Sequence, residues 1–248
     1  MAGHSHWARI KRAKAVTDSR RGRHWSKLSR AIIVAARSGG GDPDANLTLR
    51  YAMDAAREAN MPKDTIERAV KKGTGELGQT SFEELVYEGY GPGGVAILAT
   101  GFTDNRHRTA PEIKKIFELN HGNLGSSGSV AWMFTKRGTF VIPSSVTSED
   151  ALTDIALGCG ADDVQLLGDA FEVTCDPTVF DGVKKALVAA GVKPESSEIT
   201  MVPSTTITVE GEAAQQNMAL MEELDAHDDI QKVYSNFELS EADAAKLQ

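Results

Sequence analysis

The stretch that most restricts the fold is 138–203, where runs of strand-forming residues alternate with helical patterns. Short runs rich in β-branched and aromatic residues predict strands, and longer amphipathic runs predict helices. The expected strands are 139–142, 164–167, 171–174 and 197–202, and the expected helices are 148–157 and 178–190. Their order is βαββαβ, which is the order of a ferredoxin-like split βαβ unit.

Neither of the two segments that flank this unit predicts enough helices and strands for a complete domain. Before the unit we expect strands at 85–87, 95–99 and 130–134, and a helix that opens with the capping box of Thr109 and Glu112. After the unit we expect one helix at 212–227 and one strand at 230–237. We therefore predict a discontinuous α+β domain formed by 79–136 and 204–248, into which 137–203 is inserted as a ferredoxin-like domain.

The N-terminal part predicts a helical domain over 1–78, with a flexible basic arm at 1–20. Its first helix runs from about Arg21 to Ser38 and ends at three consecutive glycines. The second helix is expected to begin at Asp42-Pro43 and to end at Asn60, and the third to run from Pro62 to Gly73. The predicted fold class is thus multidomain α+β, with a three-helix domain, a middle α/β domain and an inserted ferredoxin-like domain.

Charge is distributed unevenly along the chain. The formal net charge is −8, yet the first 37 residues hold ten Lys and Arg residues and a single acid. A basic segment on an acidic protein is typical of polyanion binding, because each neutralised phosphate releases condensed counterions. The alternative, that these charges only solvate a helix, stays open.

The predicted nucleic-acid contacts in this segment are cations and two groups that can stack on bases. They are His6, Trp7, Arg9, Lys11, Arg12, Lys14, Arg20, Arg21, Arg23, Lys27 and Arg30. A helical wheel places Trp25, Leu28 and Ile32 on one side of the first helix and the cations on the other. One face can therefore pack on a core while the other meets phosphates.

Two further candidates, Arg106 and Arg108, lie in 104–109, between a predicted buried strand and a predicted helix. Free N–H groups at a helix N-terminus favour anions, so the two arginines predict a secondary phosphate contact. The alternative is that Asp104 pairs with Arg106 or Arg108.

Two motifs match known binding patterns in their residues, but the helices and strands predicted around them do not fit those patterns. Gly89-x-Gly91-x-x-Gly94 matches the dinucleotide fingerprint, but Pro92 interrupts it and a strand follows, so we expect a tight turn. Residues 136–142 resemble the RNP1 pattern of RNA-recognition motifs, although here they form the first strand rather than the third. We expect Phe140 and Phe171 to be buried; their stacking on bases is the alternative.

Other function classes find no support in the sequence. No apolar run reaches the ~20 residues that span a bilayer, and the histidines and the two cysteines lack metal-ligand spacing. We expect a cytoplasmic, non-enzymatic protein without metal or cofactor and without a membrane partner. An enzyme that uses Asp104, Arg106 and His107 remains the remote alternative.

Six segments together resemble the YebC/PmpR family of probable transcriptional regulators. They are MAGHSHW, GGGDPDAN, NMPKDTIERAVKKGTG, YEGYGPGGVA, TDNRHRT and GNLGSSGSVAWMF. The resemblance implies a three-domain protein that regulates genes in the cytoplasm by binding DNA. Related mitochondrial translational activators act on the ribosome, so an rRNA-binding translation factor is the alternative.

The predicted function is thus a nucleic-acid-binding regulator of gene expression. Its acidic α/β domains are expected to contact a protein partner. No helix-turn-helix is evident, because the helix after the three glycines opens with Asp42 and Asp44, which phosphates repel. We therefore expect no strong direct readout of base sequence.

Overall fold

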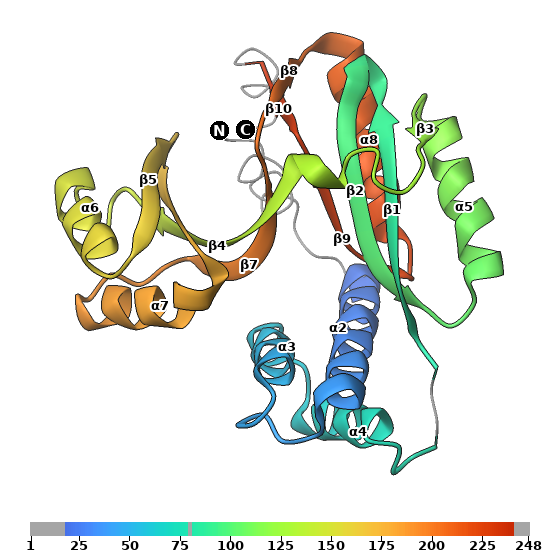
Figure 1. Cartoon of the computed structure of the whole chain (residues 1–248), viewed down its shortest axis with the longest axis horizontal. Helices are drawn as coiled ribbons and strands as arrows, with labels where there is room; N and C mark the ends of the chain where they lie inside the picture. The colour runs from blue at the N-terminus through green and yellow to red at the C-terminus, as the bar shows by residue number, and fades with distance from the viewer. Residues whose placement is uncertain (1–17, 79–80, 241–248) are drawn as a thin grey trace. The chain divides into compact units, whose positions relative to one another are not determined.

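Three helices open the described part of the chain, which comprises residues 18–78 and 81–240 of this computed structural model (Figure 1). They are α2 (Asp18–Gly39), α3 (Leu47–Glu58) and α4 (Lys63–Gly73). Their shared core is formed by apolar side chains spaced three and four residues apart, the spacing that lines one helix face. The buried members are Ile32, Ile33, Ala35, Ala36, Leu49, Ala56, Met61, Ile66 and Ala69, with Trp25 and Leu28 packed against them.

The second helix begins at Leu47, so the start predicted at Asp42 is wrong. Asn46 is the N-cap, because its Oδ1 accepts a hydrogen bond from the Leu49 N–H at 3.1 Å. The Asn46 amide also donates to the carbonyl oxygens of Ala35 and Gly40, at 2.8 and 2.9 Å. The bond to Ala35 ties the cap to α2, and the bond to Gly40 ties it to the residue that follows α2. Asp42 instead accepts the Asp44 N–H in the preceding turn at 2.9 Å.

Three strands from the middle of the chain and one strand from its C-terminal part form a four-stranded sheet in the order β3-β1-β2-β9. Its strands are β1 (Glu83–Gly91), β2 (Val95–Thr103), β3 (Asn123–Leu124) and β9 (Ile230–Ser235). The antiparallel β1–β2 hairpin closes through the 3-10 turn Pro92–Gly94, which confirms a turn at the glycine motif. Strands from both sides of the ferredoxin-like unit thus share one sheet.

Helices α5 (Arg106–Leu119) and α8 (Gly211–Ala226) lie on the same face of this sheet. A Cβ atom at Gly89 would lie 2.6 Å from the Phe117 ring of α5, and one at Gly91 would lie 2.1 Å from the Asn217 Oδ1 of α8. Alternate residues of a strand point to one face, so both helices cover the side of β1 that carries these glycines. Close packing of this kind is possible only where a side chain is missing.

The predicted start of α5 at Thr109 is also wrong. Asn105 caps the helix, its Oδ1 accepting the Arg108 N–H at 3.2 Å, and Thr109 is fully buried inside the first turn. The predicted strand at 130–134 is instead a 3-10 turn, Ala131–Met133, followed by a strand that begins at Phe134.

The ferredoxin-like unit has the predicted order of elements. It consists of β4 (Phe134–Pro143), α6 (Glu149–Gly158), β5 (Ala161–Leu167), β6 (Ala170–Cys175), α7 (Phe180–Ala189) and β7 (Ser196–Pro203). The sheet order is β5-β6-β4-β7 and all three pairings are antiparallel. Phe140 and Phe171 are buried, and Phe140 stacks on Phe180 with ring centroids 4.7 Å apart, so base stacking by these rings has no support.

The strand predicted at 230–237 is split in two. β9 ends at Ser235, and β10 (Phe237–Leu239) pairs with β8 (Ile207–Val209) in a separate two-stranded sheet. The described chain divides into two compact units, one with residues 18–130 and 209–233 and the other with 131–208 and 234–240. The predicted domain boundaries at 136 and 204 stay predictions. No helix among the described residues is long and apolar enough to cross a bilayer.

Candidate nucleic-acid interface

Most of the predicted contacts in the basic arm lie outside the described residues. These are His6, Trp7, Arg9, Lys11, Arg12 and Lys14; the backbone of Arg20 and Arg21 belongs to α2, but their side chains are not described. The structure therefore places the side chains of Arg23, Lys27, Arg30, Arg106 and Arg108 only.

Helix α2 has the two faces that the wheel predicts. The Trp25 ring packs against the helical core, and its Nε1 donates to the Ala59 carbonyl oxygen at 3.1 Å. This bond holds the apolar face of α2 against the end of α3. Arg23 is exposed on the opposite side and forms no ion pair with any described residue.

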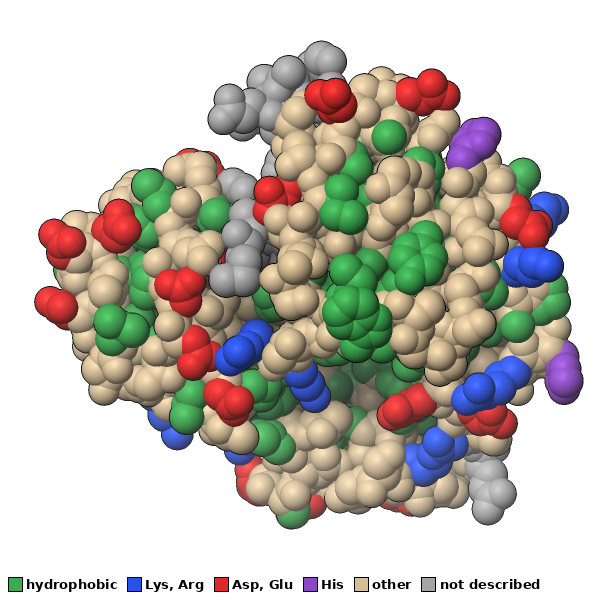
Figure 2. Space-filling view, turned by 45° about the horizontal axis from the view of Figure 1, so that its top comes forward, with side chains coloured by type: hydrophobic (Ala, Val, Ile, Leu, Met, Phe, Trp, Pro, Cys, Tyr) green, Lys and Arg blue, Asp and Glu red, His purple; other side chains and the backbone are tan. Residues whose placement is uncertain are grey.

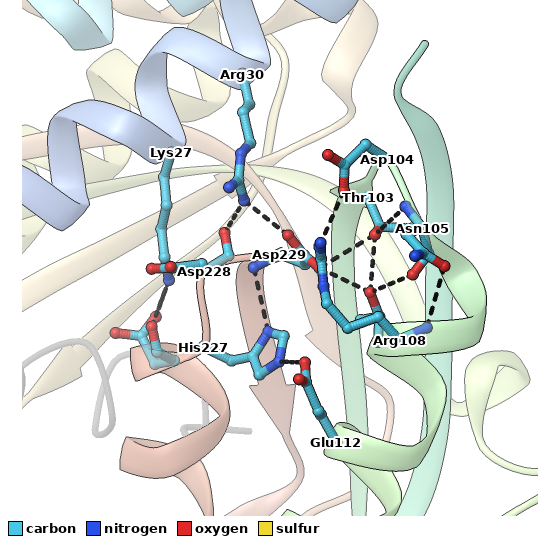
Figure 3. Close-up of polar contacts among 12 residues, drawn as sticks. Lys27, Arg30, Thr103, Asp104, Asn105, Arg108, Glu112, His227, Asp228 and Asp229 are labelled. Carbon is cyan, nitrogen blue, oxygen red and sulfur yellow. Dashed lines mark hydrogen bonds and ion pairs between the residues drawn. The ribbon is translucent and has the colours of Figure 1, made fainter.

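Lys27 and Arg30 contact a segment that we name the acidic turn, residues 225–229, formed by the last residues of α8 and the link to β9 (Figure 3). Lys27 donates to the Asp225 main-chain carbonyl and lies 3.9 Å from its carboxylate. Arg30 donates to the Asp228 carbonyl, and its Nη1 lies 3.0 Å from the Asp229 Oδ1. Two predicted phosphate contacts are thus paired within the molecule.

Asp229 is the centre of this network, with a side chain only 3 % exposed. Its Oδ2 accepts hydrogen bonds from Thr109 and Arg108, both at 2.7 Å, and from Thr103 at 3.1 Å. Burial raises the pKa of Asp229, but the hydrogen bonds from Thr109, Arg108 and Thr103 outweigh it and hold the pKa below its ordinary value. The carboxylate therefore stays charged although it is buried.

The backbone of Asp229 is held as tightly as its side chain. Its carbonyl oxygen accepts the Phe102 N–H at 2.9 Å, and a Cβ atom at Gly101 would lie 1.9 Å from that oxygen. Its own N–H donates to His227 Nδ1 at 3.2 Å, while His227 Nε2 lies 3.1 Å from a Glu112 oxygen. Because Nδ1 accepts a bond, the ring proton belongs on Nε2, where it can donate to Glu112.

The two arginines of 104–109 are engaged as well. Arg108 Nη2 bonds to Asp104 at 3.0 Å as well as to Asp229, and the Asp229 hydrogen bond raises the pKa of Arg108. Arg106 pairs with Glu83 at 2.5 Å and donates to the Glu84 carbonyl. The pairing of Asp104 with Arg108, stated as the alternative to phosphate contact, is confirmed; phosphate contact by either arginine stays a prediction.

Arg23, Arg30 and Arg108 line a cleft of about 580 Å³ together with acidic residues and His227. The acidic residues that line it are Asp104, Glu112, Asp228 and Asp229. Carboxylates thus outnumber the guanidinium groups, so the cleft in this state does not favour an anion. At the lower right of the view in Figure 2, Lys and Arg side chains likewise lie next to Asp and Glu side chains.

Three cations that the sequence analysis did not select lie on α4. Arg68, Lys71 and Lys72 are exposed and form no ion pair with any residue that the structure describes. Their spacing of three and four residues places them on one helix face. That spacing is visible in the sequence, but the density of positive charge is much higher in the first 37 residues.

The described residues hold no metal site. They contain no group of three or more His, Cys, Asp or Glu side chains that could bind a metal ion. Cys175 is buried, and burial raises the pKa of its thiol to about 11, which keeps it protonated and unreactive.

Comparison with known proteins places nearly the whole chain in one group. Residues 5–76 match the model of the TACO1/YebC protein N-terminal domain, and residues 82–237 match that of the TACO1/YebC second and third domain. A "probable transcriptional regulatory protein" of Desulfatibacillum aliphaticivorans is 50% identical over 239 residues, covering 96% of this chain and 97% of that one. One of the same description in Geobacter sp. strain M21 is 47% identical over 247 residues, the full length of both.

A solved structure agrees with the fold described above. The crystal structure of a conserved hypothetical protein from Aquifex aeolicus is 43% identical and superimposes with a TM-score of 0.81. The match covers 92% of this chain and 94% of that one.

Proposed function

This chain belongs to the TACO1/YebC family, and from that premise we propose that it regulates gene expression by holding a nucleic-acid backbone with its basic N-terminal domain. The observation that supports this proposal is the segregation of charge. Residues 1–80 hold sixteen Lys and Arg against eight Asp and Glu, whereas residues 206–248 hold two against ten. Such a field orients the basic end toward a polyanion and the acidic end away from it.

DNA is the first ligand that we propose, because the relatives are named as probable transcriptional regulatory proteins. The contacts are the cations of the arm and of the start of α2, supplemented by the basic face of α4. Contacts of this kind fix register on a backbone but read no base sequence.

Structured RNA of the ribosome is the second candidate, and the form of the helical domain favours it. The segment before α3 is acidic, so α3 is poorly suited to lie in a major groove as a recognition helix. α3 follows Asp42 and Asp44, and the two basic side chains Lys27 and Arg30 of α2 are occupied. Recognition of a backbone by shape and charge suits an A-form RNA helix, whose major groove side chains cannot read.

The rest of the molecule bears on a possible protein partner and on the enzymatic alternative. We propose that the acidic α/β domains contact a protein partner, since residues 135–205 hold five Lys and Arg against eleven Asp and Glu. An enzymatic role for Asp104, Arg106 and His107 has less support, because Asp104 pairs with Arg108 and Arg106 with Glu83. The relatives are named as regulators rather than as enzymes.

The test is the salt dependence of binding to a duplex DNA and to an rRNA fragment. Replacing Lys11, Arg12 and Lys14 with alanine should weaken binding to every sequence and flatten the plot of log K against log salt by up to about 3. The matched control replaces Lys136, Lys185 and Lys193, three exposed lysines of the ferredoxin-like unit, and should leave the slope unchanged. Equal slopes for the arm variant and the intact protein would exclude the arm as the contact.

A further inference from the structure

Lys27 and Arg30 lie on the face of α2 that the proposed function assigns to phosphates, yet both face oxygen atoms of the acidic turn. The turn presents to them a carboxylate of Asp225, a main-chain carbonyl of Asp228 and a carboxylate oxygen of Asp229. An array of oxygen acceptors with negative charge is also what a nucleic-acid backbone presents to a basic helix. The acidic turn therefore occupies these cations in the way that phosphates would.

The Asp229 carboxylate has two sides with different partners. Its Oδ2 holds Thr103, Thr109 and Arg108, which belong to β2 and α5. Its Oδ1 accepts from Arg30 alone among the described residues. Arg30 can therefore leave Asp229 while three donors still stabilise the buried charge, and the contact of β2 and α5 with the turn is kept.

The pairs made by α2 are close to solvent. The side chains of Lys27, Asp225 and Arg30 are 12 %, 23 % and 22 % exposed, whereas that of Asp229 is 3 % exposed. Arg30 also borders the same cleft as Arg23, which is exposed and has no ion-pair partner among the described residues. A phosphate bound by Arg23 would therefore lie in the cleft that Arg30 also lines, where it would offer Arg30 an alternative oxygen acceptor.

We propose that the acidic turn competes with nucleic acid for Lys27 and Arg30, so that binding exchanges carboxylate and carbonyl partners of α2 for backbone phosphates. This inference rests on the proposed function and adds its regulation. The contact is a brake on affinity, because part of the binding free energy is spent on opening it. On this proposal, a polyanion that cannot displace the acidic turn is bound by the basic arm alone.

The test removes the brake at Asp225, the more exposed of the two carboxylates that face α2. D225N takes away the charge that faces Lys27 and should tighten binding of a fluorescent duplex DNA and of an rRNA fragment on the order of fivefold, as expected for loss of one partly buried ion pair. The matched control is E212Q, the same change of charge at an exposed position of α8 that contacts Gln216 rather than α2. The control corrects for the general loss of negative charge.

A second variant identifies the cation that is released. K27Q should reduce the salt slope by about 0.9 for duplex DNA, and adding D225N to K27Q should give no more tightening than E212Q does. Hydrogen exchange of the α2 amides in the free proteins tests whether each variant is folded, and it should be faster in D225N because the contact is loosened.

The outcomes separate this inference from the proposed function. If the intact protein binds with a salt dependence but K27Q keeps its slope and D225N behaves as E212Q does, the exchange is wrong and the proposed function stands. If neither the intact protein nor D225N binds either polymer, the proposed function fails and the exchange fails with it.

Discussion

At the scale of single residues, Asp229 explains why a strongly acidic segment lies against basic and polar side chains. Its buried carboxylate accepts four side-chain hydrogen bonds, two of them from arginines. A buried charge is tolerated only when such partners replace its lost hydration. Arginine and threonine donors of this kind could bind a phosphate, but here they hold the link between α8 and β9 in place.

We expect D229N to lower the free energy of unfolding by about 3 kcal/mol, because it removes a charged partner from Arg30 and Arg108 and leaves both next to a neutral amide. Urea denaturation at neutral pH measures this value. D104N is the control: its side chain is 58 % exposed in its pair with Arg108, so a loss below about 1 kcal/mol is expected. Similar losses for the two variants would contradict the central role of Asp229.

The stability that Asp229 supplies should also depend on pH. Its pKa is lower in the folded protein than in the unfolded chain, where an Asp titrates at about 3.9. The contribution is therefore complete above that value and is lost as the pH falls through the lower folded pKa, since the unfolded state then binds more protons. We expect the stability difference between the intact protein and D229N to be constant from about pH 7 to 5 and to shrink below about 4. A difference that grows on acidification would contradict this assignment.

At the scale of elements, α4 is a helix with one buried and one basic face. Ile66 and Ala69 join the core of the helical domain, while Arg68, Lys71 and Lys72 are exposed. Lys71 and Lys72 lie in the last turn of α4, where cations also interact favourably with the helix dipole, so their position alone does not establish a role in binding. A binding measurement distinguishes the two roles.

Replacing Arg68, Lys71 and Lys72 with glutamine should reduce the salt slope for duplex DNA by up to about 2.7 if all three contact phosphates. Thermal stability should change little, because glutamine is nearly as good a helix former as lysine or arginine. The triple variant at Lys136, Lys185 and Lys193 again serves as control for net charge. A slope equal to that of this control would leave α4 with the dipole role only.

At the scale of the whole molecule, charge polarity governs how the protein meets its ligand. The net charge of −8 opposes non-specific association of most of the surface with nucleic acid, so under the proposed function we expect binding to depend on the basic N-terminal residues. With six phosphates neutralised, affinity for duplex DNA should fall roughly a thousandfold between about 50 and 200 mM salt. A titration at four salt concentrations checks this value, and a fall of less than about tenfold would mean that few phosphates are neutralised.

Whether the whole protein binds DNA or RNA in the cell requires an experiment in cells. If the protein acts on DNA, crosslinking in cells followed by sequencing of both DNA and RNA should enrich genomic sites over transcripts. Recovery of rRNA with the arm as the crosslinked segment would instead favour the translation factor. Because the same cations serve either backbone, this experiment tests the polymer without assuming it.

The positions of helices and strands followed from the sequence with few errors, and the two errors at helix starts both involve distant partners. The local signals at Asp42 and Thr109 are valid caps in isolation, yet Asn46 and Asn105 cap the helices instead. Asn46 caps α3 because its side-chain amide also donates to the Ala35 carbonyl oxygen, whereas the Thr109 hydroxyl donates to Asp229. A distant partner thus decided both cases, by supporting Asn46 as the cap of α3 and by engaging the Thr109 hydroxyl elsewhere.

The sequence by itself determined the order of elements in the ferredoxin-like unit, the glycine turn at 92–94, the apolar face of α2 and the concentration of positive charge at the N-terminus. These follow from residue periodicity and composition, which act between neighbours along the chain. Only the tertiary structure decided that Arg108 and Arg30 pair with Asp229, because these residues lie 121 and 199 positions apart. Whether a cation is free for phosphate or occupied by a carboxylate depends on which elements fold against each other, and no local pattern contains that information.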